Sequence, residues 1–143
     1  MKHAKLLSLT LVILFLGGCS AEKSPSQVYN EYNSKVINGI GYDEDKAYYS
    51  KRKQEEVESQ LPQYMEQMNK SRDEVIELYL SFSREVAKCK EITLVKEVIE
   101  GDTALLEYSQ KDICGNESPS PEKQDVRMVK EGGWKIDDVE ISL

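Results

Sequence analysis

The spacing of apolar residues changes once along the chain. Between residues 24 and 89 they recur every three to four positions, which is the period of a helix that buries one face. From residue 90 onward they form short runs separated by glycine-containing turns, a pattern typical of antiparallel strands. The sequence therefore predicts a single α+β domain over residues 24–143, with N-terminal helices packed on a curved four-stranded antiparallel sheet.

The first of three expected helices should begin at Ser24 and end near Gly39. Ser24 is a suitable N-cap, Pro25 fits the first helical position, and Gln27 completes a capping box. Glycine readily takes the left-handed conformation that ends many helices. The residues of this helix expected to face the core are Val28, Tyr32 and Val36.

A second helical region is expected over residues 43–69. It is rich in charged residues, and Pro62 should break it or start a new helix, because proline lacks the amide hydrogen that a helix interior needs. The residues of this region expected to face inward are Ala47, Tyr48, Val57, Leu61 and Met65.

The third helix has the clearest signal. Ser71 and Glu74 form a capping box, and large apolar residues follow at helical spacing. We expect this apolar stripe to be core rather than a cofactor-binding face, with the sheet curled over it. Its members are Val75, Leu78, Tyr79, Phe82 and Val86.

The second half of the chain is predicted to form two hairpins. Gly101-Asp102 is a tight-turn signal between the first two strands, and residues 131–133 (Glu-Gly-Gly) separate the last two. A change in apolar parity at Asp137-Asp138 indicates a β-bulge that would expose both acids. The expected strands are residues 92–100, 103–111, 125–130 and 134–143.

Two cysteines flank the first hairpin. A two-residue turn at Gly101-Asp102 would place Cys89 directly opposite Cys114, at a position where paired side chains approach closely. We therefore expect a disulfide between them, as is usual for exported proteins. A bulge in the long first strand would shift the exact pairing of residues. The predicted disulfide depends less on that pairing than the predicted register does.

The first eighteen residues are predicted to be a secretory leader. A basic start is followed by an uncharged stretch over residues 6–16 that is too short to cross a bilayer. The sequence Leu16-Gly17-Gly18-Cys19 resembles the lipobox of bacterial lipoproteins. The resemblance implies removal of residues 1–18, a diacylglycerol on the Cys19 sulfur, and a short tether over residues 19–23.

The lipid bilayer, reached through acylated Cys19, is accordingly the first expected partner. Ser20 stands where bacteria with two membranes usually have aspartate in lipoproteins of the inner membrane. The periplasmic face of the outer membrane is therefore favoured. In a bacterium with one membrane, the domain would sit on the extracytoplasmic face of the plasma membrane.

Charge and histidine content narrow the function. Loss of the two lysines in residues 1–18 lowers the net charge from −7 to −9, which disfavours nucleic acid as a partner. The single histidine, His3, lies in the leader, so the mature chain has no imidazole for catalysis or for zinc binding. We expect no metal, no cofactor and no enzymatic activity.

Three segments resemble small bacterial lipoproteins with a nuclear transport factor two-like, or cystatin-like, cone domain. They are SPSQVYNEY (24–32), KEITLVKEVIEGDTALLEY (90–108) and VRMVKEGGWKIDDVEI (126–141). The resemblance implies a curved sheet around helices with a cavity at its wide end. Members of the family have many roles, so the resemblance alone assigns none. The charged segment 50–70 departs from compact relatives.

Aromatic residues supply the candidate site. Most of the eight tyrosines lie in the helical half of the chain. Their amphipathic rings suit the mouth of a pocket or a protein interface. Packing at the edge of the core is the alternative explanation for their position. Trp134 follows a turn and is expected to pack the sheet rather than to stack on a ligand. The candidate pocket or interface residues are Tyr32, Tyr48, Tyr79 and Trp134.

Three functions remain open from the sequence. The first is a non-enzymatic envelope lipoprotein that binds a small apolar ligand or another envelope protein. The second is a hydrolase or isomerase that uses carboxylate and tyrosine groups in the cavity. Asp137 and Asp138 are weak candidates for its catalytic carboxylates. The third is an inhibitor or assembly factor acting through the helical segment 43–70.

Overall fold

The computed structural model of the protein describes residues 21–116 and 120–142. The leader and Cys19 lie outside these ranges. Helices come first and are followed by an antiparallel sheet of strand order β1-β2-β3-β4, which confirms the α+β class. The elements are α1 (Pro25–Asn38), α2 (Tyr42–Ala47), α3 (Lys51–Met68), α4 (Arg72–Lys88), β1 (Lys90–Glu100), β2 (Thr103–Asp112), β3 (Glu122–Lys130) and β4 (Trp134–Ser142).

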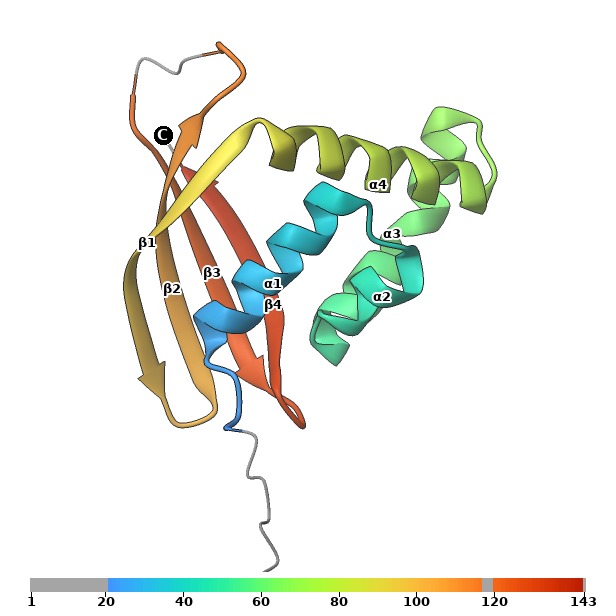
Figure 1. Ribbon diagram of the computed structural model, residues 1–143. Helices are drawn as coiled ribbons and strands as arrows, with labels where there is room; N and C mark the ends of the chain where they lie inside the picture. The colour runs from blue at the N-terminus through green and yellow to red at the C-terminus, as the bar shows by residue number, and fades with distance from the viewer. Residues whose placement is uncertain (1–20, 117–119, 143) are drawn as a thin grey trace, which may run out of the picture.

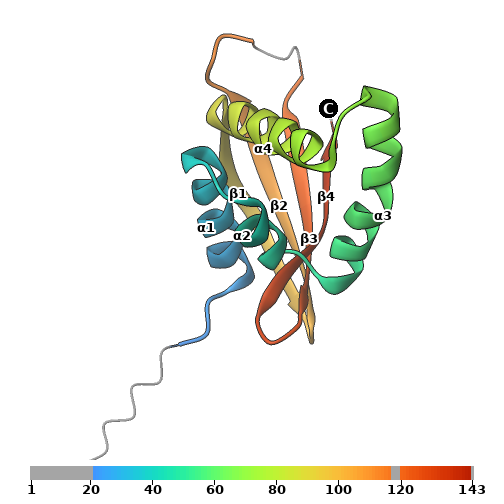
Figure 2. The same cartoon turned by 90° about the vertical axis from the view of Figure 1, so that its right-hand side faces the viewer.

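The sheet is a curved layer, and α1 lies along its inner face (Figure 1). Helix α4 runs across one end of the sheet, and α3 stands apart from α1 on the other side of the helical layer (Figure 2). The hydrophobic core lies between α1 and the sheet. Its buried apolar residues are Tyr29, Tyr32, Val36, Ile40, Ala104, Leu106, Tyr108, Val126, Met128, Trp134 and Ile136.

Helix α1 has the predicted ends. The Ser24 hydroxyl accepts a hydrogen bond from the Gln27 amide at 3.2 Å, and the Gln27 side chain accepts one from the Ser24 amide at 2.9 Å. Gly39 ends the helix with a φ of 93°, in the left-handed region. Tyr32 and Val36 are buried as expected.

The second helical region breaks earlier than predicted. The chain forms α2 and α3 with the break at Tyr48–Ser50, and α3 continues through the exposed Pro62. Two backbone hydrogen bonds to β4 fix the position of the break. The Ser50 amide donates to the Ile136 carbonyl at 2.9 Å, and the Ile136 amide donates to the Tyr48 carbonyl at 2.8 Å. Ser50 then caps α3.

The inward face of this region is also narrower than predicted. Leu61 is buried, Tyr48, Val57 and Met65 are half-buried, and Ala47 is exposed. Helix α3 packs on α4 and meets β4 only through its first residues, such as Arg52 and Lys53, so Leu61 is its one buried residue.

The apolar stripe of α4 is not core, contrary to the prediction. Val75 is buried, but Phe82 is 71% exposed, and Leu78, Tyr79 and Val86 are exposed as well. The sheet curls over α1 instead, so α4 turns a different face to the interior. The half-buried residues of that face are Ile76, Leu80, Ser83 and Ala87.

Both hairpin turns are where the sequence predicts them, but β1 contains a bulge. Glu100 pairs with Thr103 beside the turn, and the register shifts by one residue at Val95. Cys89 and Cys114 are therefore not directly opposed in the ladder, although they form the predicted disulfide with their Cα atoms 5.1 Å apart. The bulge lets Ile92, Leu94 and Ile99 share one face of β1, and it leaves the disulfide in place.

The predicted bulge in β4 is present at Asp137, between the pairs Arg127–Asp138 and Met128–Ile136. It does not expose both acids as expected. Asp137 is buried and accepts hydrogen bonds from the Ser50 hydroxyl at 2.6 Å and from Arg52 Nε at 2.9 Å. The bulge thus turns a carboxylate toward the start of α3.

Candidate functional site

Four elements bring polar groups together on the helical side of the core. Asp45 lies in the middle of the short helix α2 and is 3% exposed. The Tyr32 hydroxyl on α1 donates to Asp45 Oδ1 at 2.9 Å and lies 2.7 Å from the Tyr49 hydroxyl. The Tyr79 hydroxyl on α4 lies 3.4 Å from that of Tyr49. We call these four residues the tyrosine–aspartate cluster.

Burial controls the protonation of the cluster. Desolvation raises the pKa of Asp45 from 3.8 to about 6, while the hydroxyls of Tyr32 and Tyr79 favour the ionised form and limit the rise. Burial also raises the pKa of Tyr32 and of Tyr49 far above 10, helped by the nearby acidic groups. The phenols of the cluster are therefore neutral at physiological pH, and Asp45 is the group that titrates near neutrality.

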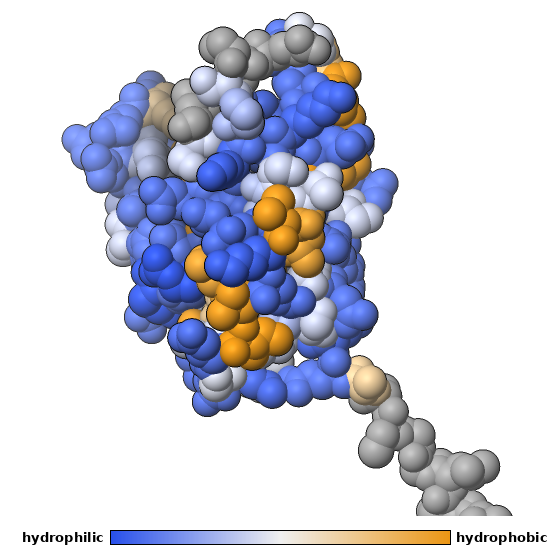
Figure 3. Space-filling model, turned by 90° about the vertical axis from the view of Figure 1, so that its left-hand side faces the viewer, coloured by the Kyte–Doolittle hydropathy of each residue, from blue (hydrophilic) through white to orange (hydrophobic). Residues whose placement is uncertain are grey.

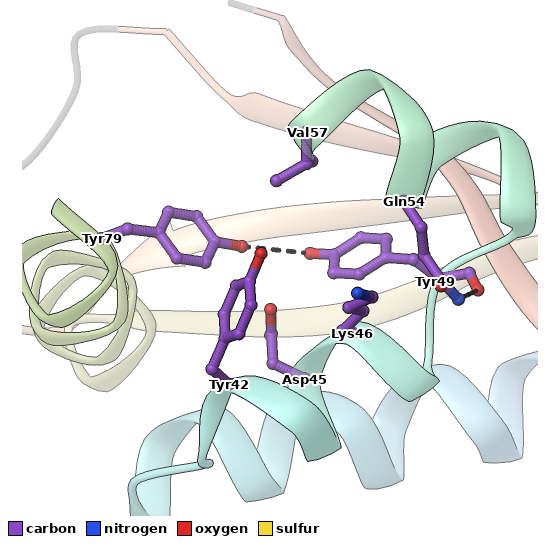
Figure 4. A pocket seen from close by; sticks show the side chains of 7 residues that line it. All are labelled: Tyr42, Asp45, Lys46, Tyr49, Gln54, Val57 and Tyr79. Carbon is purple, nitrogen blue, oxygen red and sulfur yellow. Dashed lines mark hydrogen bonds between the residues drawn. The ribbon is translucent and has the colours of Figure 1, made fainter. Parts of the chain in front are cut away.

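A small cavity adjoins the cluster, with a volume of about 20 Å³. Asp45, Tyr49 and Tyr79 point into it, as Figure 4 shows. One water needs about 10–15 Å³ on this measure, so the cavity has room for a group the size of one water molecule. Its lining residues are Tyr42, Asp45, Lys46, Tyr49, Gln54, Val57 and Tyr79.

A much larger apolar groove lies between α3 and α4. Its volume is about 660 Å³, within the range of small-ligand pockets. One wall is a helical face of α3, and the other is the α4 stripe that the sheet leaves uncovered. The lining residues are Tyr42, Val57, Gln60, Leu61, Tyr64, Met68, Val75, Ile76, Leu78, Tyr79 and Phe82.

A third hollow, of about 240 Å³, lies between α1, α4 and the sheet. Tyr32 and Tyr79 line it together with core residues such as Tyr29 and Val36. The hollow lies on the inner face of the sheet, beside α1. The apolar groove is the larger of the two, with about 660 Å³ against about 240 Å³.

The candidate residues from the sequence fall into two groups. Tyr32 and Tyr79 meet in the tyrosine–aspartate cluster. The Tyr48 ring packs on that of Tyr32 with centroids 5.2 Å apart, but its hydroxyl donates to Glu31 at 3.0 Å on the outer side. Trp134 is buried in the core and lines none of the three hollows.

Sequence reasoning did not single out Asp45, the central residue of the cluster. One signal was present: Tyr42 and Asp45 are three residues apart and share a helix face. With 26 acids in the chain, that spacing does not distinguish Asp45 from other carboxylates. Asp137 and Asp138 lie elsewhere, against Arg52 and Lys53 of α3.

Among residues 21–116 and 120–142, no group of three or more His, Cys, Asp or Glu side chains is placed to hold a metal ion. In that part of the chain, no helix has the length and apolar character needed to span a bilayer.

The fold and the site define an α+β domain with a tyrosine-rich helical side and an open apolar groove. No family model and no curated protein matches the sequence. A solved structure of an NTF2-like protein of unknown function from Cytophaga hutchinsonii is similar with a TM-score of 0.43 and 10% identity. The match covers 86% of this chain and 92% of that protein.

Proposed function

We propose that the protein is a lipid-anchored envelope lipoprotein whose domain binds a small apolar ligand in the groove between α3 and α4. The observation that carries this proposal is the groove itself, with its volume of about 660 Å³ and its lining of mainly apolar side chains. Natural ligand pockets have this size and combine apolar walls with a few placed polar groups. Gln60 and the Tyr42 hydroxyl are such groups here.

The groove is a better ligand site than the outer surface of the sheet. Exposed apolar residues occur there too, and Figure 3 shows them as separate groups divided by polar side chains. Leu105 of β2 is one of them, since its neighbours Ala104 and Leu106 are buried on the inner face. In the groove, by contrast, apolar side chains from two helices line one hollow, so a ligand would remove apolar surface on both sides from water.

An enzyme using carboxylate and tyrosine is the alternative, and the tyrosine–aspartate cluster has the required groups. Asp45 has a raised pKa of about 6, which suits general acid–base work. However, the cavity beside it has a volume of only about 20 Å³, which leaves no room for the reacting part of a substrate larger than water. The geometry therefore favours binding over catalysis.

Binding can be tested with matched leucine substitutions. Leu78 lines the groove and Leu105 lies on β2, and the two are 45% and 40% exposed, so neither replacement by glutamine should unfold the protein. Titration calorimetry of the mature chain with dodecanol should show binding that Leu78→Gln weakens about tenfold or more and Leu105→Gln leaves unchanged. Equal effects of both substitutions, or no binding by the parent protein, would refute the groove as the site.

The lipid anchor is tested separately. Replacing Cys19 by serine should abolish labelling with radioactive palmitate and leave a precursor that retains residues 1–18, because the thiol is the atom that accepts the lipid. Cys114→Ser is the control, since Cys114 lies in the folded domain. Labelling that persists in Cys19→Ser would contradict the anchor without affecting ligand binding.

A further inference from the structure

The apolar groove has a polar end. Three of its lining residues, Tyr42, Val57 and Tyr79, also line the small cavity beside Asp45. The two hollows therefore adjoin, and the cavity lies where the groove meets α2. Figure 4 shows the Asp45 carboxylate between the rings of Tyr42, Tyr49 and Tyr79. A ligand in the groove thus has apolar walls along its length and one acidic group at its end.

The Asp45 carboxylate can accept more hydrogen bonds than it receives. An ionised carboxylate accepts up to about four hydrogen bonds, and Asp45 accepts one from Tyr32 at 2.9 Å, with the Tyr79 hydroxyl nearby. No lysine or arginine in residues 21–116 and 120–142 forms a salt bridge with Asp45. Lys46, which lines the same cavity, has its ammonium 3.3 Å from Glu58 instead.

A buried anion of this kind is costly unless a cation accompanies it. Hydrogen bonds from the Tyr32 and Tyr79 hydroxyls lower the pKa of Asp45, but burial outweighs them and raises it to about 6, and the phenols bring no positive charge. The titratable side chains around Asp45 are Tyr32, Tyr42, Tyr49, Tyr79 and Lys46. At pH 7.5 Asp45 is mostly ionised, so the cavity presents a negative charge to whatever enters it.

We propose that the groove binds an amphiphile with a primary ammonium group, whose alkyl chain lies between α3 and α4 and whose ammonium occupies the small cavity and pairs with Asp45. The inference rests on the proposed function and names its ligand class. A primary ammonium is about as large as one water, which the cavity admits, whereas a quaternary ammonium is too bulky. Tyrosine rings also attract a cation placed over their faces.

Three ligands with the same twelve-carbon chain test the proposal: dodecylamine, dodecanol and dodecanoate, each titrated at pH 7.5 at concentrations where it is dissolved as single molecules. The mature chain should bind dodecylamine at least about tenfold more tightly than dodecanol, because a charge-assisted hydrogen bond to a buried carboxylate is stronger than a neutral one. Dodecanoate should bind most weakly, since two negative charges would meet in the cavity.

The variant Asp45→Asn keeps the shape and the Tyr32 partner but removes the charge. It should lose the preference for dodecylamine and keep the affinity for dodecanol. Asp43→Asn removes the same charge from an exposed position of α2 and should keep the preference. Equal binding of all three ligands would overturn the ammonium site and leave the groove as a binding site. Failure of all three to bind would overturn the proposed function as well.

Discussion

The hydroxyl of Tyr32 donates a 2.9 Å hydrogen bond to Oδ1 of Asp45, and both residues are buried. The bond joins α1, which fills the curved sheet, to the short helix α2. Because Tyr32 also contacts the Tyr49 hydroxyl, a single phenol links α1 to the segment that leads into α3. The position of the α3 wall of the groove therefore depends on a polar network whose carboxylate titrates near neutrality.

Asp45 should make the domain less stable as the pH rises. Its folded-state pKa of about 6 exceeds the ordinary value of 3.8, so the fold binds the proton more tightly than the unfolded chain does. This contribution is fully present below about pH 4 and is lost as the pH passes 6, with a total of about 3 kcal/mol. Asp45→Asn should therefore gain stability relative to the parent protein between pH 4 and pH 7.

Urea unfolding followed by the fluorescence of Trp134, the single tryptophan and a buried one, measures this effect. The difference in unfolding free energy between Asp45→Asn and the parent protein should change across that pH range. Asp43→Asn, exposed on the same helix, controls for the loss of one negative charge. A difference that stays constant from pH 4 to pH 7 would show that Asp45 is not buried as described.

Tyr32→Phe should destabilise the domain by about 1–3 kcal/mol, because Asp45 and Tyr49 both lose a buried partner. It should also steepen the pH dependence, since the Tyr32 hydroxyl favours the ionised form of Asp45. Tyr64→Phe is the matched control: Tyr64 is 42% exposed, and loss of its hydroxyl should change the unfolding free energy little. Equal effects of the two substitutions would contradict the network.

The sequence predicted correctly the helix caps and hairpin turns, which depend on residues close together in the chain. The capping boxes at Ser24 and Ser71 and the turn at Gly101-Asp102 are all present, because caps and turns depend on neighbouring residues. The break at Tyr48–Ser50 was not foreseeable, since backbone bonds to Ile136 fix it. The spacing of apolar residues within 43–69 therefore does not show where the helix breaks.

The site was harder to predict for the same reason. Tyr32 and Tyr79 were candidates because of their residue type, but Asp45 gains its character from burial, which comes from α1 and α4 packing around α2. The prediction that the apolar stripe of α4 is core was wrong, because periodicity shows that a face is apolar and not what covers it. That stripe forms one wall of the groove.

The disulfide should contribute about 3–4 kcal/mol to stability, because it closes a loop between residues separated by 25 positions. It joins the end of α4 to the end of β2. The double variant Cys89→Ser/Cys114→Ser should unfold at lower urea concentration than the oxidised parent protein and should match the reduced parent protein. Non-reducing mass spectrometry of a tryptic digest should recover the two cysteines in one linked peptide. Two free thiols would contradict the pairing.

Asp137 should act on stability in the opposite direction to Asp45. Burial disfavours its charge, but hydrogen bonds from Arg52 and Ser50 outweigh burial and lower its pKa below 3.8. Its contribution is therefore present above the unfolded pKa and is lost as the pH falls through the folded one.

Asp137→Asn should accordingly destabilise the domain at pH 7 and cost progressively less toward pH 3, when its unfolding is compared with that of the parent protein. Asp138→Asn is the control, because Asp138 is bound only by a 3.5 Å ion pair with Lys53 near the surface, and such pairs contribute little. A cost of Asp137→Asn that grows as the pH falls would contradict the pairing with Arg52.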